Sequence, residues 1–139
     1  MIGIGMLITA VRNPVISSAI EPIVKQVVPT TAIPYVIIFT LAAPLALYRG
    51  PLSLWGMGSG LVAIIQKSTS LASNAIMGML MSVGQIQGIC DPTNTHNIWI
   101  ATYLGTDTQT LLRKTAPYAW LATIAGLCLA VAFKFVPFG

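Results

Sequence analysis

The stretch GQIQGICDPTNTHN, residues 84–97, is where residue types and spacing could do chemistry. An apolar run (75–87) leads into it, another (98–104) leads out of it, and Pro92 stands where a helix should break. Six polar side chains fill the interruption: Asp91, Thr93, Asn94, Thr95, His96 and Asn97. Asp91 could bind a cation, or take up and release a proton, and His96 could relay a proton. The threonine and asparagine side chains offer oxygens to a hard cation, or hydroxyl and amide donors to a carboxylate.

A plainer interpretation of the same stretch is also open. It could be a solvent-exposed loop between two ordinary helices, in which Asp91 starts a turn and Asn94 caps the next helix. The apolar arm that follows, Ile98 to Leu104, is far shorter than the about 20 residues that a spanning helix needs. A short arm favours a broken helix, and we therefore expect residues 91–97 to line a site for a substrate or an ion.

Composition indicates the class of protein. Of the 139 residues, 55% are apolar and only 7% are charged, against about 25% charged in an average soluble domain. Because so few charges could not cover a soluble domain, the sequence predicts an all-α, polytopic protein of the cell inner (cytoplasmic) membrane, with the lipid bilayer as a partner. Residues 1–139 are long enough for about four to six segments of one membrane domain. The net charge of +4 is scattered along the chain, which argues against a nucleic-acid partner.

Three apolar stretches predict membrane helices, and they cover residues 35–48, 73–88 and 121–136. Pro44 is expected to kink the first helix rather than end it, because a neighbouring helix can satisfy the freed carbonyl. Gly105 to Lys114 is expected to be a polar loop. Tyr118 and Trp120 are expected to anchor the chain at a membrane interface.

Two short apolar arms flank a polar Asn13-Pro14 turn at the start of the chain. Met1 to Val11 is too short to span a membrane, and Val15 to Val28 is interrupted by charged residues and a proline. The pattern predicts either a re-entrant hairpin with Asn13 at its tip, or the tail of a spanning helix followed by an interfacial helix. A further apolar stretch, residues 54–65, contains a GxxxG at 56–60 that would allow close approach of another helix.

The order of segments from Tyr35 onward follows a known pattern. An apolar helix ends in YRGPLS, and a glycine-bearing helix and a small-residue helix follow. The polar break CDPTNTHNIW comes next, then an arm ending in IATYLG, the loop TDTQTLLRKTAPYAW and a last helix. This succession resembles the C-terminal half of the citrate–metal/proton symporter family and, more loosely, the wider ion transporter superfamily. Its most specific part is Pro92 to Trp120.

The resemblance implies a secondary active transporter, a symporter, of an organic anion such as citrate or another carboxylate, coupled to H⁺ or Na⁺. It implies two halves of inverted topology, each giving a hairpin and a broken helix to a site near the middle of the membrane. This chain would be the C-terminal part of a larger or two-part transporter, assembled with an N-terminal half or as a homo-oligomer. The polar break would supply the substrate and ion contacts of one half.

Three residues outside the break complete the predicted site. Arg49 could offer its planar guanidinium to the anion, Ser53 lies in the same interruption, and Asn13 would contribute if the first turn is a hairpin tip. No catalytic motif is present, and one histidine cannot support a zinc site with the usual spacing. We therefore expect no enzyme, no bound metal and no cofactor beyond the coupling ion. The alternative function is a small oligomeric membrane channel or a structural membrane subunit.

Overall fold

The computed structural model describes residues 13–29, 31–50, 52–53, 64–66 and 69–136, together with Met6, Thr9, Gly58 and Val62. These residues are helical and contain no strand, which confirms the all-α prediction. The helices are α2 (Pro14–Val27), α3 (Ala32–Ala42), the 3-10 helix η1 (Ala43–Arg49), α5 (Ser73–Cys90), α6 (Thr95–Tyr103) and α7 (Thr108–Ala132). The first hairpin arm, apart from two residues, and the GxxxG at 56–60 lie outside the described residues.

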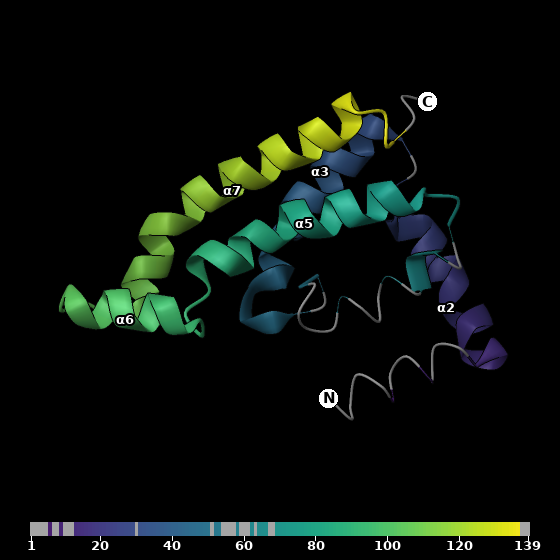
Figure 1. Ribbon diagram of the computed structural model, residues 1–139. Helices are drawn as coiled ribbons and strands as arrows, with labels where there is room; N and C mark the ends of the chain where they lie inside the picture. Colours follow the sequence, from purple (N-terminus) through teal and green to yellow (C-terminus); the bar gives the residue numbers. More distant parts are fainter. Residues whose placement is uncertain are drawn as a thin grey trace.

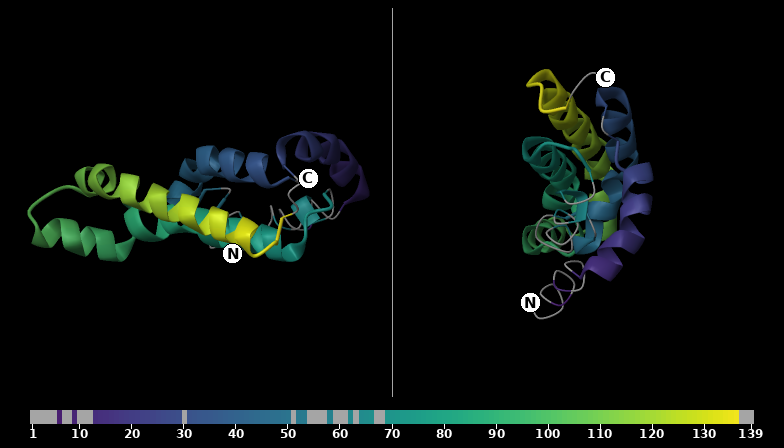
Figure 2. Two further views of the ribbon diagram at one scale, coloured as in Figure 1. Left: turned by 90° about the horizontal axis from the view of Figure 1, so that it is seen from above. Right: turned by 90° about the vertical axis from the view of Figure 1, so that its right-hand side faces the viewer.

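The long helices α5 and α7 form an antiparallel pair, side by side in all views (Figures 1 and 2). Close approach is possible because Gly126 of α7 faces Ser82 of α5, where an added Cβ would lie 2.6 Å from the serine Oγ. One helical turn away, the Thr123 hydroxyl donates to the Ser82 carbonyl at 3.0 Å. Small residues and a buried hydroxyl therefore set the register of this pair.

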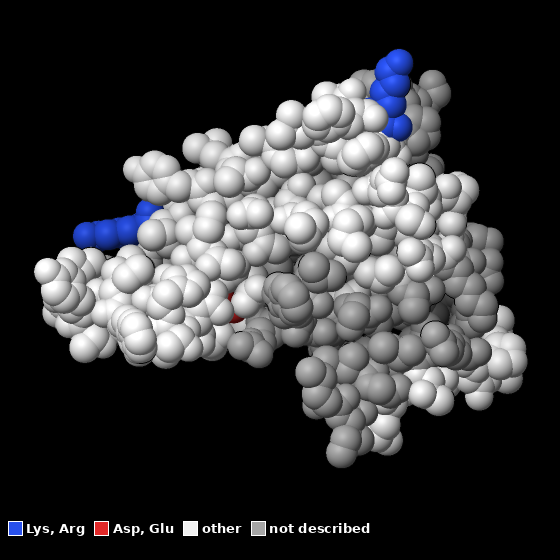
Figure 3. Space-filling model, viewed as in Figure 1, with Lys and Arg blue, Asp and Glu red and all other residues white. Residues whose placement is uncertain are grey.

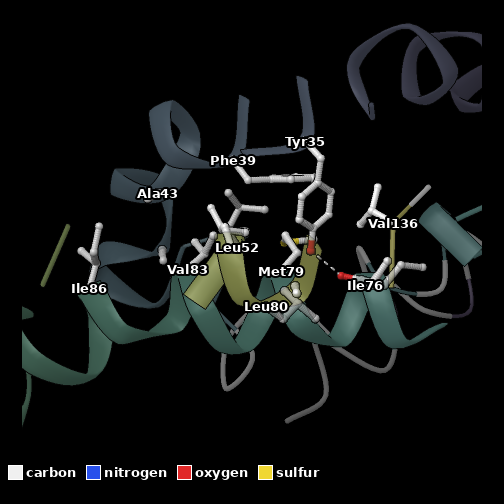
Figure 4. Close-up of a cluster of buried hydrophobic side chains, with 14 of the residues drawn as sticks. Tyr35, Phe39, Ala43, Leu52, Ile76, Met79, Leu80, Val83, Ile86 and Val136 are labelled. Carbon is white, nitrogen blue, oxygen red and sulfur yellow. Dashed lines mark hydrogen bonds between the residues drawn. The ribbon is translucent and has the colours of Figure 1, made fainter. Parts of the chain in front are cut away.

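The apolar core lies where α3 and η1 cross the α5–α7 pair (Figure 4). Tyr35 and Phe39 of α3 contact edge to face, with ring centroids 5.2 Å apart. The fully buried Tyr35 hydroxyl donates to the Ala75 carbonyl of α5 at 2.7 Å. An aromatic ring thus fills the space between the helices, and its polar end is satisfied by the backbone.

Pro44 ends the α-helical part of the first apolar stretch. It has no N–H to donate to the Thr40 carbonyl, and α3 gives way at Ala43 to the tighter η1, whose first step is a bond from Ala43 N–H to that carbonyl. The Trp120 indole Nε1–H of α7 donates to the same carbonyl at 2.8 Å. The expected kink is therefore a change of helix type, and a neighbouring helix does satisfy the freed carbonyl.

The prediction of a polar loop at 105–114 is wrong over most of that range, because α7 begins at Thr108. Gly105, at φ +62, closes α6 with a bond from Thr106 N–H to the Ala101 carbonyl at 2.9 Å. Asp107 then caps α7, its carboxylate accepting from Thr110 N–H at 3.2 Å. Because this cap starts the helix early, α7 runs from Thr108 to Ala132 rather than over the predicted 121–136.

The Trp120 bond should stabilise the fold most while residue 44 is proline. Trp120→Phe should lower the free energy of unfolding in detergent micelles by about 0.5–1.5 kcal/mol. In a Pro44→Ala background the new N–H can bond to Thr40, so the same substitution should cost measurably less. Tyr118→Phe, at a ring that is 74% exposed, is the control and should change nothing. Equal costs of Trp120→Phe in both backgrounds would contradict this account.

The first turn of α7 should depend on pH. The pKa of Asp107 is held below its ordinary value, chiefly by the hydrogen bond with Thr110. Because the folded-state pKa is the lower one, the cap stabilises this turn above about pH 4 and is lost as the pH falls through the folded-state pKa. Protection of the Thr110 amide, relative to its intrinsic exchange rate, should fall on acidification. Asp107→Asn, which retains the cap, should remove that pH dependence.

Candidate functional site

Asp91 stands at the break between α5 and α6, and its carboxylate is fully buried. It precedes Pro92, which disfavours the helical conformation for the residue before it, and its ψ of 121° ends α5. Its Oδ1 accepts from the Thr93 backbone N–H at 2.8 Å and from the Thr93 hydroxyl at 2.6 Å. Its Oδ2 is buried and has no hydrogen-bond partner in the part of the chain that the structure describes. One carboxylate oxygen is therefore left for a proton or a cation.

The side chains of the two asparagines in the break donate to carbonyls at the end of α5. The Asn94 Nδ2 donates to the Gln87 carbonyl at 2.6 Å, and Gln87 Nε2 donates to Asn94 Oδ1 at 3.3 Å. The Asn97 Nδ2 donates to the carbonyls of Ile89 at 3.1 Å and Asp91 at 2.9 Å. The last carbonyls of a helix have no partner within it, and these amides supply one. Asn94 begins α6 by position, but its side chain makes no cap bond there.

The remaining polar residues of the break are exposed. Thr93 uses its hydroxyl on Asp91, whereas Thr95 and His96 open α6 with side chains in solvent-accessible positions. The structure thus brings Asp91, Thr93, Asn94 and Asn97 into one hydrogen-bonded group. Thr95 and His96 lie beside that group and make no side-chain hydrogen bond to it.

Of the other predicted site residues, Asn13 and Ser53 make no hydrogen bond to this group among the described residues. Asn13 is exposed and accepts only from Val15 N–H at 3.1 Å, and its helix α2 lies at the opposite end of the molecule from α6 (Figures 1 and 2). Ser53 is fully buried, and its Oγ has no partner in the described residues. Arg49 closes η1, which packs against α5, but its side chain lies outside the described residues.

Gln87 belongs to the site and was missed by the sequence analysis. It is 8% exposed and bonds to Asn94 in both directions, through its side chain and its carbonyl. The available signal was a glutamine inside an uncharged, apolar helix, where a polar side chain needs a partner. Gln87 and Asn94 are seven positions apart. This spacing matches no local hydrogen-bonding pattern, so the sequence did not indicate that they pair.

No family model matches this chain, and neither a curated protein nor a solved structure matches it. The resemblance to citrate symporters therefore remains a prediction from the sequence.

Asn97 should stabilise the break through its donors. Asn97→Ala should lower the free energy of unfolding by about 1–3 kcal/mol, because buried carbonyls lose a partner. Asn97→Asp should cost at least as much at pH 7, since a carboxylate would face two carbonyl oxygens, and should regain stability on acidification. Chemical denaturation in micelles at pH 7 and pH 4 measures both effects.

Thr95→Ala, two residues earlier and exposed, is the matched control and should stay within about 0.5 kcal/mol of the parent. Wild-type stability of Asn97→Asp at pH 7 would refute the capping role.

Proposed function

We propose that this chain is a polytopic membrane protein in which the antiparallel α5 and α7 cross the bilayer. Within the described residues, α7 is the helix that is long and apolar enough to span, at 25 residues. Helix α5 has 18 residues, carries no charged side chain and follows α7 along its length. Large apolar side chains on α3 and α7 are exposed, which suits contact with lipid: Ile33, Ile37, Leu121 and Leu129.

The charges of α7 fit the two edges of a bilayer. Arg113 and Lys114 lie in its second turn, and Lys134 follows its end. The chain between Lys114 and Lys134 corresponds to about 30 Å of helix, which is the thickness of the hydrocarbon core. Figure 3 supports this placement, because the basic side chains on that face lie near the two ends of α7 and the described surface between them is white.

We propose that the protein works as a secondary active transporter of an organic anion, with Asp91 as the binding site of the coupling H⁺ or Na⁺. The observation that carries the proposal is the buried Oδ2 of Asp91, which has no donor in the described part of the chain, at a break between two helices. A buried carboxylate without a counter-charge is costly, and binding a cation would relieve that cost. The carboxylate substrate, such as citrate, comes from the family resemblance alone.

The proposed membrane placement puts Asp91 near one edge of the hydrocarbon core. Its neighbour Cys90 lies against Thr115 of α7, directly after Lys114. A cation could therefore reach Asp91 from the side that Arg113 and Lys114 mark. This differs from the mid-membrane position that the family resemblance implies.

A structural membrane subunit is the second candidate. It is favoured by the two asparagines, whose amides are used to hold the α5–α6 break together. In that case the break would have a purely architectural role, and Asp91 would serve only to hold Thr93.

Transport should depend on the Asp91 charge. The purified chain in proteoliposomes should accumulate labelled citrate or a related carboxylate when a Na⁺ or H⁺ gradient is imposed, and the effective gradient would name the ion. Asp91→Asn should abolish that accumulation while leaving the unfolding transition intact, because the amide Oδ1 can still accept from Thr93.

Asp107→Asn is the matched control, because it removes the same charge at an exposed cap, and it should retain uptake. A leak that does not depend on the gradient would favour a channel. Absence of any uptake by folded protein would favour the structural subunit.

A further inference from the structure

Gln85 places an exposed carboxamide on the apolar face of α5. Among the described residues its one hydrogen bond is long, from Nε2 to the Met81 carbonyl at 3.4 Å. By the register of the pair, it lies between Ser82, opposite Gly126, and Cys90, opposite Thr115. In the membrane placement proposed above, on which this step rests, that amide would stand in hydrocarbon, where an unmet polar group costs several kcal/mol.

The surface around this amide is open to another helix. Gly84 and Gly88, on either side of it, would each accept a Cβ with nothing within 4 Å. A shallow groove of about 360 Å³ runs between α5 and α7 at this point, and it is lined in part by Met81, Gln85, Ala122, Ala125, Gly126 and Leu129. Figure 3 shows no basic side chain on the described surface between the two ends of α7. Small residues beside one polar group are typical of packing between membrane helices.

We propose that this face of α5 binds a second copy of the same chain across a two-fold axis along the membrane normal. A carboxamide carries two N–H donors and an acceptor oxygen, so two Gln85 side chains related by that axis can each give one N–H to the other's oxygen, and the second N–H remains for the Met81 carbonyl. The partial charges of the amide are thus complementary to those of its own symmetry mate. The glycines allow the two α5 helices to approach closely, and the groove receives the partner's side chains. A two-fold interface uses the same patch on both copies, as this arrangement requires.

Cysteine cross-linking in proteoliposomes tests the contact. In a Cys128→Ser background, Gln85→Cys should form a disulfide-linked dimer on mild oxidation. Ile37→Cys, on the exposed face of α3, is the control and should stay monomeric. Equal cross-linking at both positions, or none at position 85, would overturn the proposal, as would cross-linking of Gln85→Cys only to a different protein.

Association strength gives an independent measurement. Fluorescence energy transfer between labelled copies in vesicles should show that Gln85→Leu weakens dimerisation about tenfold, since interhelical hydrogen bonds each contribute modestly. Gly84→Leu should also weaken it, although the space at Gly84 lets the single chain fold unchanged. Unaltered association in both variants would refute the interface.

These outcomes are separable from those of the transport proposal. Resistance of the chain to carbonate extraction reports the membrane placement, and gradient-driven uptake reports the transport. A chain that resists extraction and loses uptake on Asp91→Asn, but forms no dimer, would refute the interface alone. A dimer without any uptake would refute the transport proposal alone.

Discussion

The structure depends on satisfying backbone carbonyls where its helices stop. In the proposed membrane placement no water is available to satisfy them. At Pro44 the Ala43 N–H and the Trp120 indole replace the donor that proline lacks, and at the end of α5 the amides of Asn94 and Asn97 donate to the last carbonyls. At the end of α6 the turn around Gly105 closes the backbone on itself. These three breaks are thus each paired with a specific donor, and the side-chain donors link α7 to α3 and the start of α6 to α5.

Asp91 stands apart because it cannot be satisfied in that way. Three buried polar atoms lack a partner in the described residues: Thr40 Oγ1, Ser53 Oγ and Asp91 Oδ2. The two hydroxyls are neutral, whereas an ionised carboxylate carries a charge and can only accept, so leaving it without a partner costs more. A proton or a cation brought from outside is the remaining way to satisfy Oδ2. This difference singles out Asp91 as the candidate functional group in the fold.

The sequence predicted the helical class, the helix ending in the polar break and the short arm after it, because these depend on local hydropathy and on Pro92. The hydrogen bonds of Asn94 and Asn97 to carbonyls at the end of α5 were not predicted, since they depend on how the chain turns back after Pro92. The early start of α7 was not predicted. The residues after Asp107 are polar and suggested a loop, whereas the Asp107 cap starts the helix among them. The partnership of Trp120 with Thr40, 80 positions apart, is set by tertiary packing alone.

The proposed site and the proposed dimer place different demands on α5. Near its end, α5 must hold one buried carboxylate next to an aqueous edge, and the fold does this with donors from its own chain. Closer to its middle, α5 exposes an amide for which the described fold offers only a long intrahelical bond. If lipid surrounded a single copy, that amide would have to remain unsatisfied. A second copy in the proposed dimer removes that cost without any new chemistry. The cation proposed at Asp91 and the second copy proposed at Gln85 would therefore answer the same constraint, because each would satisfy a polar atom that lipid leaves without a partner.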